Sequence, residues 1–255
     1  MQNKEIKKRI EENGNVFGTW CMLPSDFTID AICKSGIDFI VIDMEHGAMN
    51  WETAERMVRA AECNNTIPII RTTLDTEDII LHALETNVKS ILVPHVSTKK
   101  QAEKIANASK YNPKGNRGLS PYTRCHNYDH NNLENSLNKV NNETFIGILV
   151  EGEFGLSNLE EICTVDGIDL IYLGIYDIAQ SLNLSGDISN PKCLKALSES
   201  LKIIHKKGKL AGTFTRSIKD AKEFKKLGFE FIAYLADSNA LLQFYSNAFS
   251  DFRSE

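Results

Sequence analysis

Short apolar runs rich in β-branched residues alternate with helical segments of about a dozen residues along the chain. Most runs are continuously hydrophobic, which is typical of parallel strands covered on both faces. We identify eight runs: Val16–Leu23, Phe39–Met44, Ile67–Thr72, Ser90–Val96, Phe145–Glu151, Leu170–Gly174, Leu210–Thr215 and Phe229–Leu235. The clearest helical patterns between them are Trp51–Cys63, Glu77–Thr86, Lys99–Lys110, Lys192–Lys207 and Ile218–Leu227.

Eight strands with intervening helices in 255 residues predict a (β/α)8 TIM barrel that occupies residues 1–255 as one domain. The structural alternative is a doubly wound open sheet. Such a sheet usually has fewer strands and a glycine-rich phosphate turn after the first one, and the sequence contains no G-x-G-x-x-G. The barrel is therefore the favoured fold.

Composition argues against several classes of partner. Lys and Arg total 29 against 34 Asp and Glu, so the net charge is −5, and no basic run with interleaved aromatics indicates nucleic-acid binding. No stretch approaches the roughly 20 apolar residues of a membrane helix. The charged N-terminus does not resemble a signal peptide, and the six cysteines are scattered. We therefore expect a cytoplasmic protein with reduced thiols and neither nucleic-acid nor membrane partners.

One long irregular segment, Tyr111–Asn132, interrupts the alternation. Loops of this length inside a compact domain are usually functional, so the segment is a candidate active-site or interface element. His126 and His130 within it have a spacing that could ligate zinc on a helix. Because they lie in an asparagine-rich loop, we interpret both as solvated loop histidines.

Polar residues lie at the ends of five consecutive predicted strands. In a TIM barrel the active site lies at the carboxyl ends of the strands, so these residues indicate one site. They are Asp43, Glu45 and His46 at the end of the second strand, Arg71 at the end of the third, His95 at the fourth, Glu151 at the fifth and Asp177 at the sixth.

Each of these residues has more than one interpretation on the sequence alone. Glu151 and Asp177 could form an acid/base couple, a site for a hard cation such as Mg²⁺ or Mn²⁺, or part of a salt bridge. His46 could be a general base oriented by Asp43, or a histidine that caps the strand–loop junction. Arg71 could pair with a structural carboxylate or receive an anionic substrate.

The ordered motifs resemble the HpcH/HpaI family of class II pyruvate-type aldolases over nearly the whole chain. They are G-T-W at Gly18–Trp20, I-D-M-E-H at Ile42–His46, P-I-I-R at Pro68–Arg71, L-V-P-H-V at Leu92–Val96, G-N-R-G at Gly115–Gly118, V-E and L-x-N-L-E-E-I within Val150–Ile162, and Y-L-G-x-x-D at Tyr172–Asp177.

The resemblance implies a modified TIM barrel that binds a small keto acid. It also implies a homo-oligomer, built from trimers and possibly a hexamer, in which the last helix is exchanged between subunits. The roles it implies for individual residues are a divalent metal, Mg²⁺ or Mn²⁺, on Glu151 and Asp177, a base at His46 oriented by Asp43, stabilisation of an enolate or carbonyl oxygen by Arg71, a wall at Trp20, and capture of the keto-acid carboxylate by the amides of Gly174 and Ile175.

The chain departs from the family pattern around these residues. The family commonly has Gln-x-Glu-Thr where Leu149–Gly152 stands, Gly-Pro-x-Asp-Leu-Ser where Gly174–Ala179 stands, and an apolar residue at the position of His95. In its length, its Lys/Asn/Ile-rich character and the extra histidine, His95, the chain is similar to the citrate synthase branch of staphyloferrin-type siderophore pathways.

That branch implies condensation of oxaloacetate with the co-substrate acetyl-CoA to give citrate. His46 and His95 would share the roles of base and thioester hydrogen-bond donor, in either order. Arg124 and the Tyr111–Asn132 segment are candidates for contacting the phosphates of CoA. The family majority favours an alternative, cleavage of 4-hydroxy-2-keto acids to pyruvate and an aldehyde, and a third interpretation is a non-catalytic metabolite-binding barrel.

Overall fold

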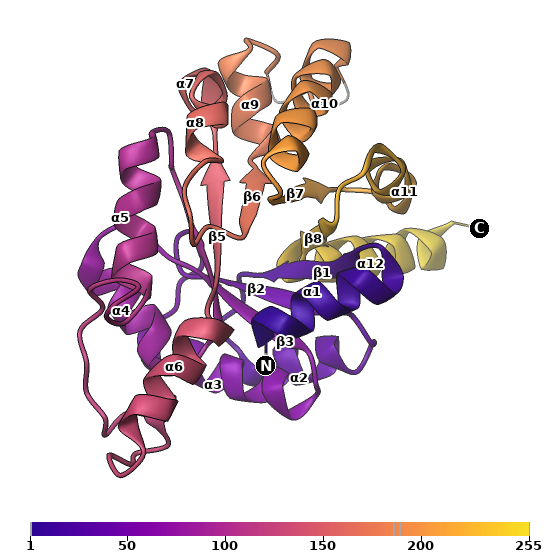
Figure 1. Cartoon of the computed structure of the whole chain (residues 1–255). Coiled ribbons are helices and arrows are strands. Elements are labelled where there is room, and N and C mark those ends of the chain that lie inside the picture. The colour runs from indigo at the N-terminus through magenta and orange to yellow at the C-terminus, as the bar shows by residue number, and fades with distance from the viewer. Residues whose placement is uncertain (1, 186, 189, 255) are drawn as a thin grey trace.

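The computed structural model describes residues 2–185, 187–188 and 190–254. Within them, eight parallel strands form a closed barrel in chain order, with β8 paired to β1 (Figure 1). The strands are β1 (Val16–Cys21), β2 (Phe39–Asp43), β3 (Ile67–Arg71), β4 (Ser90–Val93), β5 (Phe145–Val150), β6 (Leu170–Leu173), β7 (Leu210–Thr215) and β8 (Phe231–Ala236). The predicted TIM barrel is confirmed.

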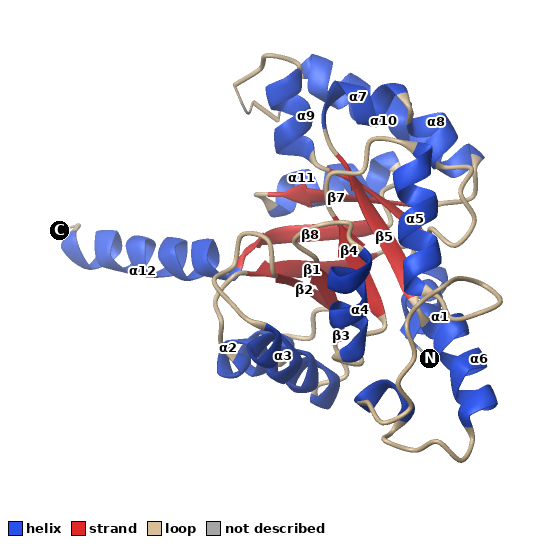
Figure 2. Ribbon diagram, turned by 90° about the vertical axis from the view of Figure 1, so that its left-hand side faces the viewer, coloured by secondary structure: helices blue, strands red, loops and turns tan. Residues whose placement is uncertain are grey.

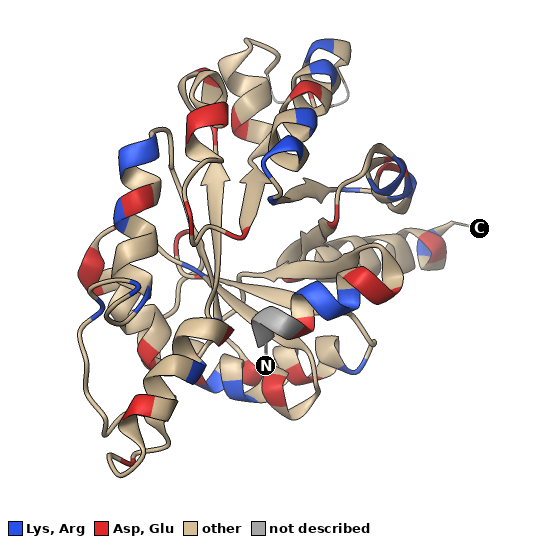
Figure 3. Cartoon of the chain, in the orientation of Figure 1, with Lys and Arg blue, Asp and Glu red and all other residues tan. Residues whose placement is uncertain are grey.

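Helices surround the barrel and follow the predicted alternation. They are α1 (Gln2–Asn13), α2 (Asp26–Cys33), α3 (Trp51–Cys63), α4 (Glu77–Glu85), α5 (Lys99–Ser109), α6 (Leu133–Glu143), α7 (Gly152–Ser157), α8 (Leu159–Ile162), α9 (Ile175–Ser181), α10 (Pro191–Lys206), α11 (Ile218–Leu227) and α12 (Asp237–Arg253), with a 3₁₀ turn η1 at Arg124–His126. Residues of both charges are interspersed along the outer helices (Figure 3).

Side chains at the loop–helix junctions define where several helices begin. Ser25, Asn50 and Ser217 each accept a hydrogen bond from a backbone N–H in the first turn of the helix that follows. Thr98 and Gln101 form a reciprocal capping box at the start of α5. Such caps satisfy amides that would otherwise have no partner, and each contributes about 1 kcal/mol.

Two layers of apolar side chains fill the fold. One lies between strands and helices, and the other fills the barrel interior with large residues such as Phe39 and Phe231, whose rings stack 3.8 Å apart. Ile6 of α1 is fully buried in the interior layer, so α1 closes the end of the barrel where the strands begin. The opposite end, where the strands finish, is left for a pocket.

The Tyr111–Asn132 segment lies at the closed end of the barrel, because it connects the end of α5 to α6 and β5. Figure 1 shows α6 beside α1 at that end. Arg124 pairs with Glu62 and donates to the Thr86 carbonyl oxygen. The prediction that the segment and Arg124 belong to the active site is therefore wrong within this chain, while a role at an interface stays a prediction.

His126 also differs from its predicted state. It is buried, with its ring nitrogens 2.7 Å from Ser136 Oγ and 3.0 Å from Tyr111 Oη, so it is a core histidine rather than a solvated one. His130 is exposed, as predicted, and its ring packs against Tyr122.

The last helix, α12, extends away from the barrel (Figure 2). Within Asp237–Arg253, Asp237 alone is buried, where its carboxylate accepts hydrogen bonds from the amides of Met22 and Leu23. In the part of the chain that the structure describes, no helix has the length and apolar character needed to cross a membrane.

Candidate active site at the carboxyl ends of the strands

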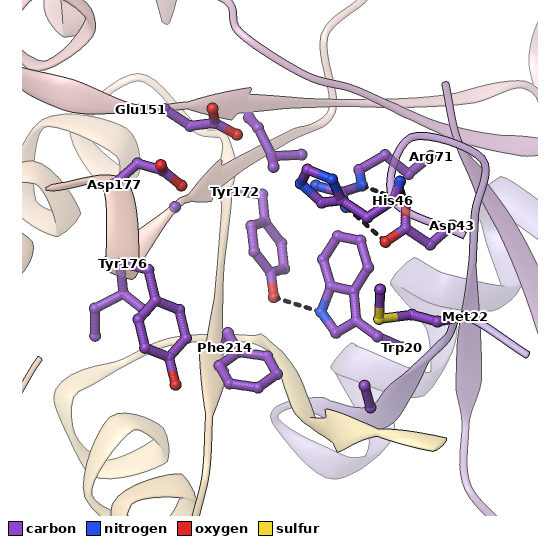
Figure 4. Close-up of a pocket in the computed structure, with 14 residues that line it drawn as sticks. Trp20, Met22, Asp43, His46, Arg71, Glu151, Tyr172, Tyr176, Asp177 and Phe214 are labelled. Carbon is purple, nitrogen blue, oxygen red and sulfur yellow. Dashed lines mark hydrogen bonds and ion pairs between the residues drawn. The ribbon is translucent and has the colours of Figure 1, made fainter. Parts of the chain in front are cut away.

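A pocket of about 320 Å³ opens at the end of the barrel where the strands finish. Eight of the nine residues predicted to form the site line it, from β1, β2, β3, β5 and β6 or the turns after them (Figure 4). They are Trp20, Asp43, His46, Arg71, Glu151, Gly174, Ile175 and Asp177. The ninth, His95, contacts Glu151 from the turn after β4.

Arg71 is held by two carboxylates. Asp43 and Arg71 are paired residues on the neighbouring strands β2 and β3, so the sheet register places them side by side. Both are buried, and Nε and Nη2 of Arg71 donate to the two carboxylate oxygens of Asp43 at 2.8 and 2.6 Å. Nη1 lies 3.0 Å from Glu45 Oε2. Arg71 therefore has the structural ion pair that was one of its two interpretations.

Asp43 acts on His46 through the backbone. Its Oδ1 atom accepts hydrogen bonds from the amides of Glu45, at 3.0 Å, and His46, at 3.2 Å. These bonds fix the turn that carries His46, whose ring lies at the wall of the pocket (Figure 4). Among the described residues, no side chain forms a hydrogen bond with the His46 ring, so the turn rather than the imidazole is what Asp43 orients.

His95 joins two carboxylates at the pocket rim. Its Nε2 lies 2.7 Å from Glu45 Oε1 and its Nδ1 lies 2.9 Å from Glu151 Oε2. Its backbone φ of 58° is in the left-handed region, which non-glycine residues adopt only at a cost. Burial lowers the pKa of His95, but the charges of Glu151 and Glu45 outweigh burial and leave that pKa raised.

These contacts form a continuous set of ion pairs that we call the charged side of the pocket. It consists of Asp43, Arg71, Glu45, His95 and Glu151.

Glu151 and Asp177 approach the pocket from different elements. Glu151 follows β5 directly, whereas Asp177 lies in the first turn of α9, because β6 ends at Leu173 and a helix begins at Ile175. Both carboxylates point toward the same side of the pocket (Figure 4). Gly174 leaves room for Glu151, since a Cβ atom at Gly174 would lie 2.7 Å from Glu151 Cγ.

The two carboxylates fit a hard divalent cation. Burial raises the pKa of Glu151, and the charges of Asp177 and Glu45 raise it further against the opposing effect of His95. A cation between Glu151 and Asp177 would relieve that repulsion. Among the described residues, no group of three or more His, Cys, Asp or Glu residues suited to a metal is found. Mg²⁺ and Mn²⁺ need only one or two carboxylates, with water and substrate as further ligands.

The amides of Gly174 and Ile175 are not equivalent. The Gly174 amide donates to the Val150 carbonyl oxygen at 3.2 Å, so it is already engaged between β5 and β6. Ile175 is the first residue of α9, a position whose N–H has no partner inside the helix. Of the two predicted donors, only the Ile175 amide lacks a hydrogen-bond partner among the described residues.

Aromatic side chains line a second part of the pocket, which we call the aromatic side. Its residues are Trp20, Tyr172, Tyr176 and Phe214. Trp20 Nε1 donates to Tyr172 Oη at 3.2 Å (Figure 4), and the Arg71 guanidinium lies 4.6 Å from the centroid of the Trp20 ring. Tyr176 and Phe214 contact each other with ring centroids 5.6 Å apart.

Sequence reasoning missed Tyr172 and Phe214 as pocket residues. Both lie within apolar strands, whereas the predicted site rests on the polar residues at strand ends. Their position on the alternate, inward-facing residues of β6 and β7 was the available signal.

The chain is similar in sequence to one family of known proteins over most of its length. The profile of the HpcH/HpaI aldolase/citrate lyase family matches residues 17–243. The hydroxypyruvate/pyruvate aldolase of Roseobacter denitrificans is 29% identical over 237 residues, which cover 93% of this chain and 92% of that protein. The 2-keto-3-deoxy-L-rhamnonate aldolase of Klebsiella pneumoniae is 28% identical, with 98% and 93% of the two chains covered.

Among solved structures, that of the citrate synthase SbnG superposes with a TM-score of 0.88 at 27% identity and covers 97% of both chains. The resemblance drawn from the motifs is thus confirmed, and it identifies an enzyme of the aldolase or lyase type. Because the family profile matches residues 17–243, this chain belongs to the HpcH/HpaI aldolase/citrate lyase family.

Proposed function

We propose that this enzyme is metal-dependent and condenses oxaloacetate with acetyl-CoA to form citrate. The observation that carries the proposal is His95, which ties Glu151 to Glu45 where the family commonly has an apolar residue. The similarity to the citrate synthase SbnG over 97% of both chains supports the same assignment.

In this proposal Glu151 and Asp177 hold Mg²⁺ or Mn²⁺, which when bound would polarise the ketone of the keto acid. The free amide of Ile175 receives the carboxylate next to that ketone. Arg71, fixed by Asp43 and Glu45, offsets charge that develops on the ketone oxygen. Trp20, whose ring lies against the Arg71 guanidinium, limits the access of water to that side chain.

His46 is the base that we favour. Both ring nitrogens of His95 are engaged with carboxylates, whereas the His46 ring faces the pocket without a described partner. His46 removes a proton from the methyl carbon of acetyl-CoA, and that carbon bonds to the ketone carbon of oxaloacetate. The ketone oxygen takes up a proton to become a hydroxyl group. Water then hydrolyses the thioester and releases citrate and the CoA thiol.

A second candidate reaction is the cleavage of 4-hydroxy-2-keto acids to pyruvate and an aldehyde. It is favoured by the names of the relatives at 28–29% identity, which are pyruvate-type aldolases. The same metal ligands would serve, and His46 would remove the proton of the 4-hydroxyl group. His95 would then have no direct part in the chemistry.

An assay on the purified full chain tests the proposal. Protein, Mg²⁺, oxaloacetate and acetyl-CoA should give one thiol and one citrate per turnover, and chelation of the metal should abolish both. Pyruvate release from 4-hydroxy-2-keto acids without any citrate would favour the aldolase instead.

Substitution of His95 separates the two reactions. His95→Ala should lower citrate formation by on the order of 100-fold and aldol cleavage by less, because only the condensation uses a second imidazole, as the hydrogen-bond donor to the thioester oxygen. His205→Ala is a matched control, because His205 is also paired with a carboxylate, Glu230 at 2.9 Å, but lies on α10 outside the pocket. Equal losses in both reactions would contradict a special role in condensation.

We also propose that the enzyme is a homo-oligomer, built from trimers, in which α12 packs on a neighbouring subunit. The helix carries exposed large apolar residues, which normally mark a protein contact: Leu241, Leu242, Phe244, Tyr245, Phe249 and Phe252. Light scattering of the full chain should give a trimer or hexamer, and Phe249→Asp with Phe252→Asp should shift the mass downward. A monomeric wild type would contradict this assembly.

A further inference from the structure

Arg216 is a cation beside the pocket with no ionic partner among the described residues. Six of the eight arginines in the sequence form ion pairs with carboxylates, whereas within the described residues Arg216 has neither an ion pair nor a hydrogen bond. It directly follows β7, at the same end of the barrel as the other site residues. Glu151 has the same position directly after β5.

A ring that lines the pocket holds Arg216 in place. The guanidinium carbon lies 5.7 Å from the centroid of the Tyr176 ring, and Tyr176 in turn packs on Phe214. Tyr176 and Phe214 both line the pocket, at the side away from Arg71 in Figure 4. A guanidinium stacked on an aromatic face keeps its N–H groups free at its edge, where they can bind a carboxylate.

Among the described residues that line the pocket, Arg71 is the only arginine or lysine. Its charge is already offset by the carboxylates of Asp43 and Glu45, so it offers a second substrate carboxylate little net attraction. Glu151 and Asp177 would repel such a carboxylate if it came near them without the metal between. An anion at the end of the substrate that is remote from the metal is therefore directed toward the aromatic side.

We infer that Arg216 binds the distal carboxylate of a dicarboxylic 2-keto acid. The inference rests on the proposed keto-acid function and deepens it, because it names the residue that recognises the distal carboxylate and so selects a diacid over a monocarboxylic keto acid. Arg216 contributes to affinity and specificity, while the ketone and its adjacent carboxylate remain with Glu151, Asp177 and Ile175.

The test compares two keto acids that differ only at the distal group. Oxaloacetate has a carboxylate where 2-oxobutanoate has a methyl group, and their dissociation constants are measured by calorimetry on the Mg²⁺-loaded full chain. Arg216→Met should weaken oxaloacetate binding about tenfold, the effect of one charge-assisted hydrogen bond, and change 2-oxobutanoate binding less than twofold. Arg216→Lys should recover part of the loss. Lys225→Met, at the far end of α11, is the control for removing a positive charge.

Each other outcome overturns the assignment. If Arg216→Met weakens both keto acids equally, Arg216 supports the whole pocket and does not recognise the distal group. If it raises the KM of acetyl-CoA and leaves oxaloacetate binding unchanged, the anion that it binds is a CoA phosphate. If the wild-type enzyme binds neither keto acid, the proposed function fails as well. If the wild type binds both keto acids tightly and Arg216→Met changes neither dissociation constant, the Arg216 assignment is wrong and the proposed function is unaffected.

Discussion

On the charged side of the pocket each side chain is held by at least one oppositely charged neighbour, whereas the aromatic side is held by ring contacts and one hydrogen bond. The charged side comes from β2 to β5 and the turns after them. Its pairs join neighbouring strands or turns, except for Glu45 and His95, which meet across the end of β3. The aromatic side comes from β1, β6 and β7 and the start of α9. We conclude that the charged side holds its side chains more firmly than the aromatic side does.

Because charges that are buried together depend on one another, a single substitution on the charged side should cost more than one on the aromatic side. The predictions below test that difference, from the largest expected effect to the smallest.

Glu151→Gln should have the largest effect. It keeps the size of the side chain but removes the charge that pairs with His95 and that the proposed divalent metal requires. Turnover with either keto-acid reaction should fall by on the order of 10³ or more, because a bound cation contributes several kcal/mol to catalysis. Steady-state rates and the metal content after dialysis measure the loss. Glu153→Gln, exposed on α7 two residues away, should change neither, and near-normal rates for Glu151→Gln would remove the metal assignment.

Asp43→Asn should chiefly destabilise the fold. It would leave the buried guanidinium of Arg71 without its two-oxygen partner, and breaking a buried ion pair from one side costs about 3–5 kcal/mol. Denaturant unfolding should show this loss of free energy. Glu52→Gln is a fitting comparison, since Glu52 pairs with Arg56 on the exposed face of α3 and the change should cost less than about 1 kcal/mol. Similar costs for the two changes would mean that burial adds nothing to the Asp43–Arg71 pair.

Gly174→Ala should weaken metal binding with little effect on folding. The new methyl group would approach Glu151 Cγ to 2.7 Å, so the Glu151 side chain must shift. Displacing a metal ligand typically lowers affinity about 10 to 100-fold, which titration with Mn²⁺ would measure. Gly118→Ala is the control, because a Cβ atom there meets nothing closer than 3.6 Å. Unchanged Mn²⁺ affinity would show that the Glu151 side chain can shift without losing the metal, contrary to the rigid packing expected of the charged side.

The sequence was sufficient for the barrel and for the members of the charged side, but not for their contacts. Continuous apolar runs located all eight strands, and the residues after them included Asp43, Arg71, His95 and Glu151. That Arg71 pairs with Asp43 depends on the register between β2 and β3, which no single run reveals. Asp177 was placed at a strand end, and its helical position follows from the early end of β6 at Leu173.

The misplacement of the Tyr111–Asn132 segment has a simple cause. The length of the segment alone predicts a functional loop, whereas its position in the alternation determines at which end of the barrel it lies. A segment that follows a helix and leads into a strand reaches the end of the barrel where strands begin. The same rule of position, applied to β7 as it was to β2 through β6, would have found Arg216.

Tyr172→Phe tests the aromatic side and should have the smallest effect. It removes the oxygen that accepts the Trp20 indole N–H at 3.2 Å, and an unsatisfied buried donor costs about 1–3 kcal/mol. Denaturant unfolding followed by tryptophan fluorescence reports both the stability and the surroundings of Trp20. Tyr176→Phe removes a hydroxyl that has no described partner, and it should cost almost nothing while keeping the contacts with Phe214 and Arg216. If Tyr172→Phe proved as costly as Asp43→Asn, the aromatic side would be fixed as firmly as the charged side, and the contrast between them would be lost.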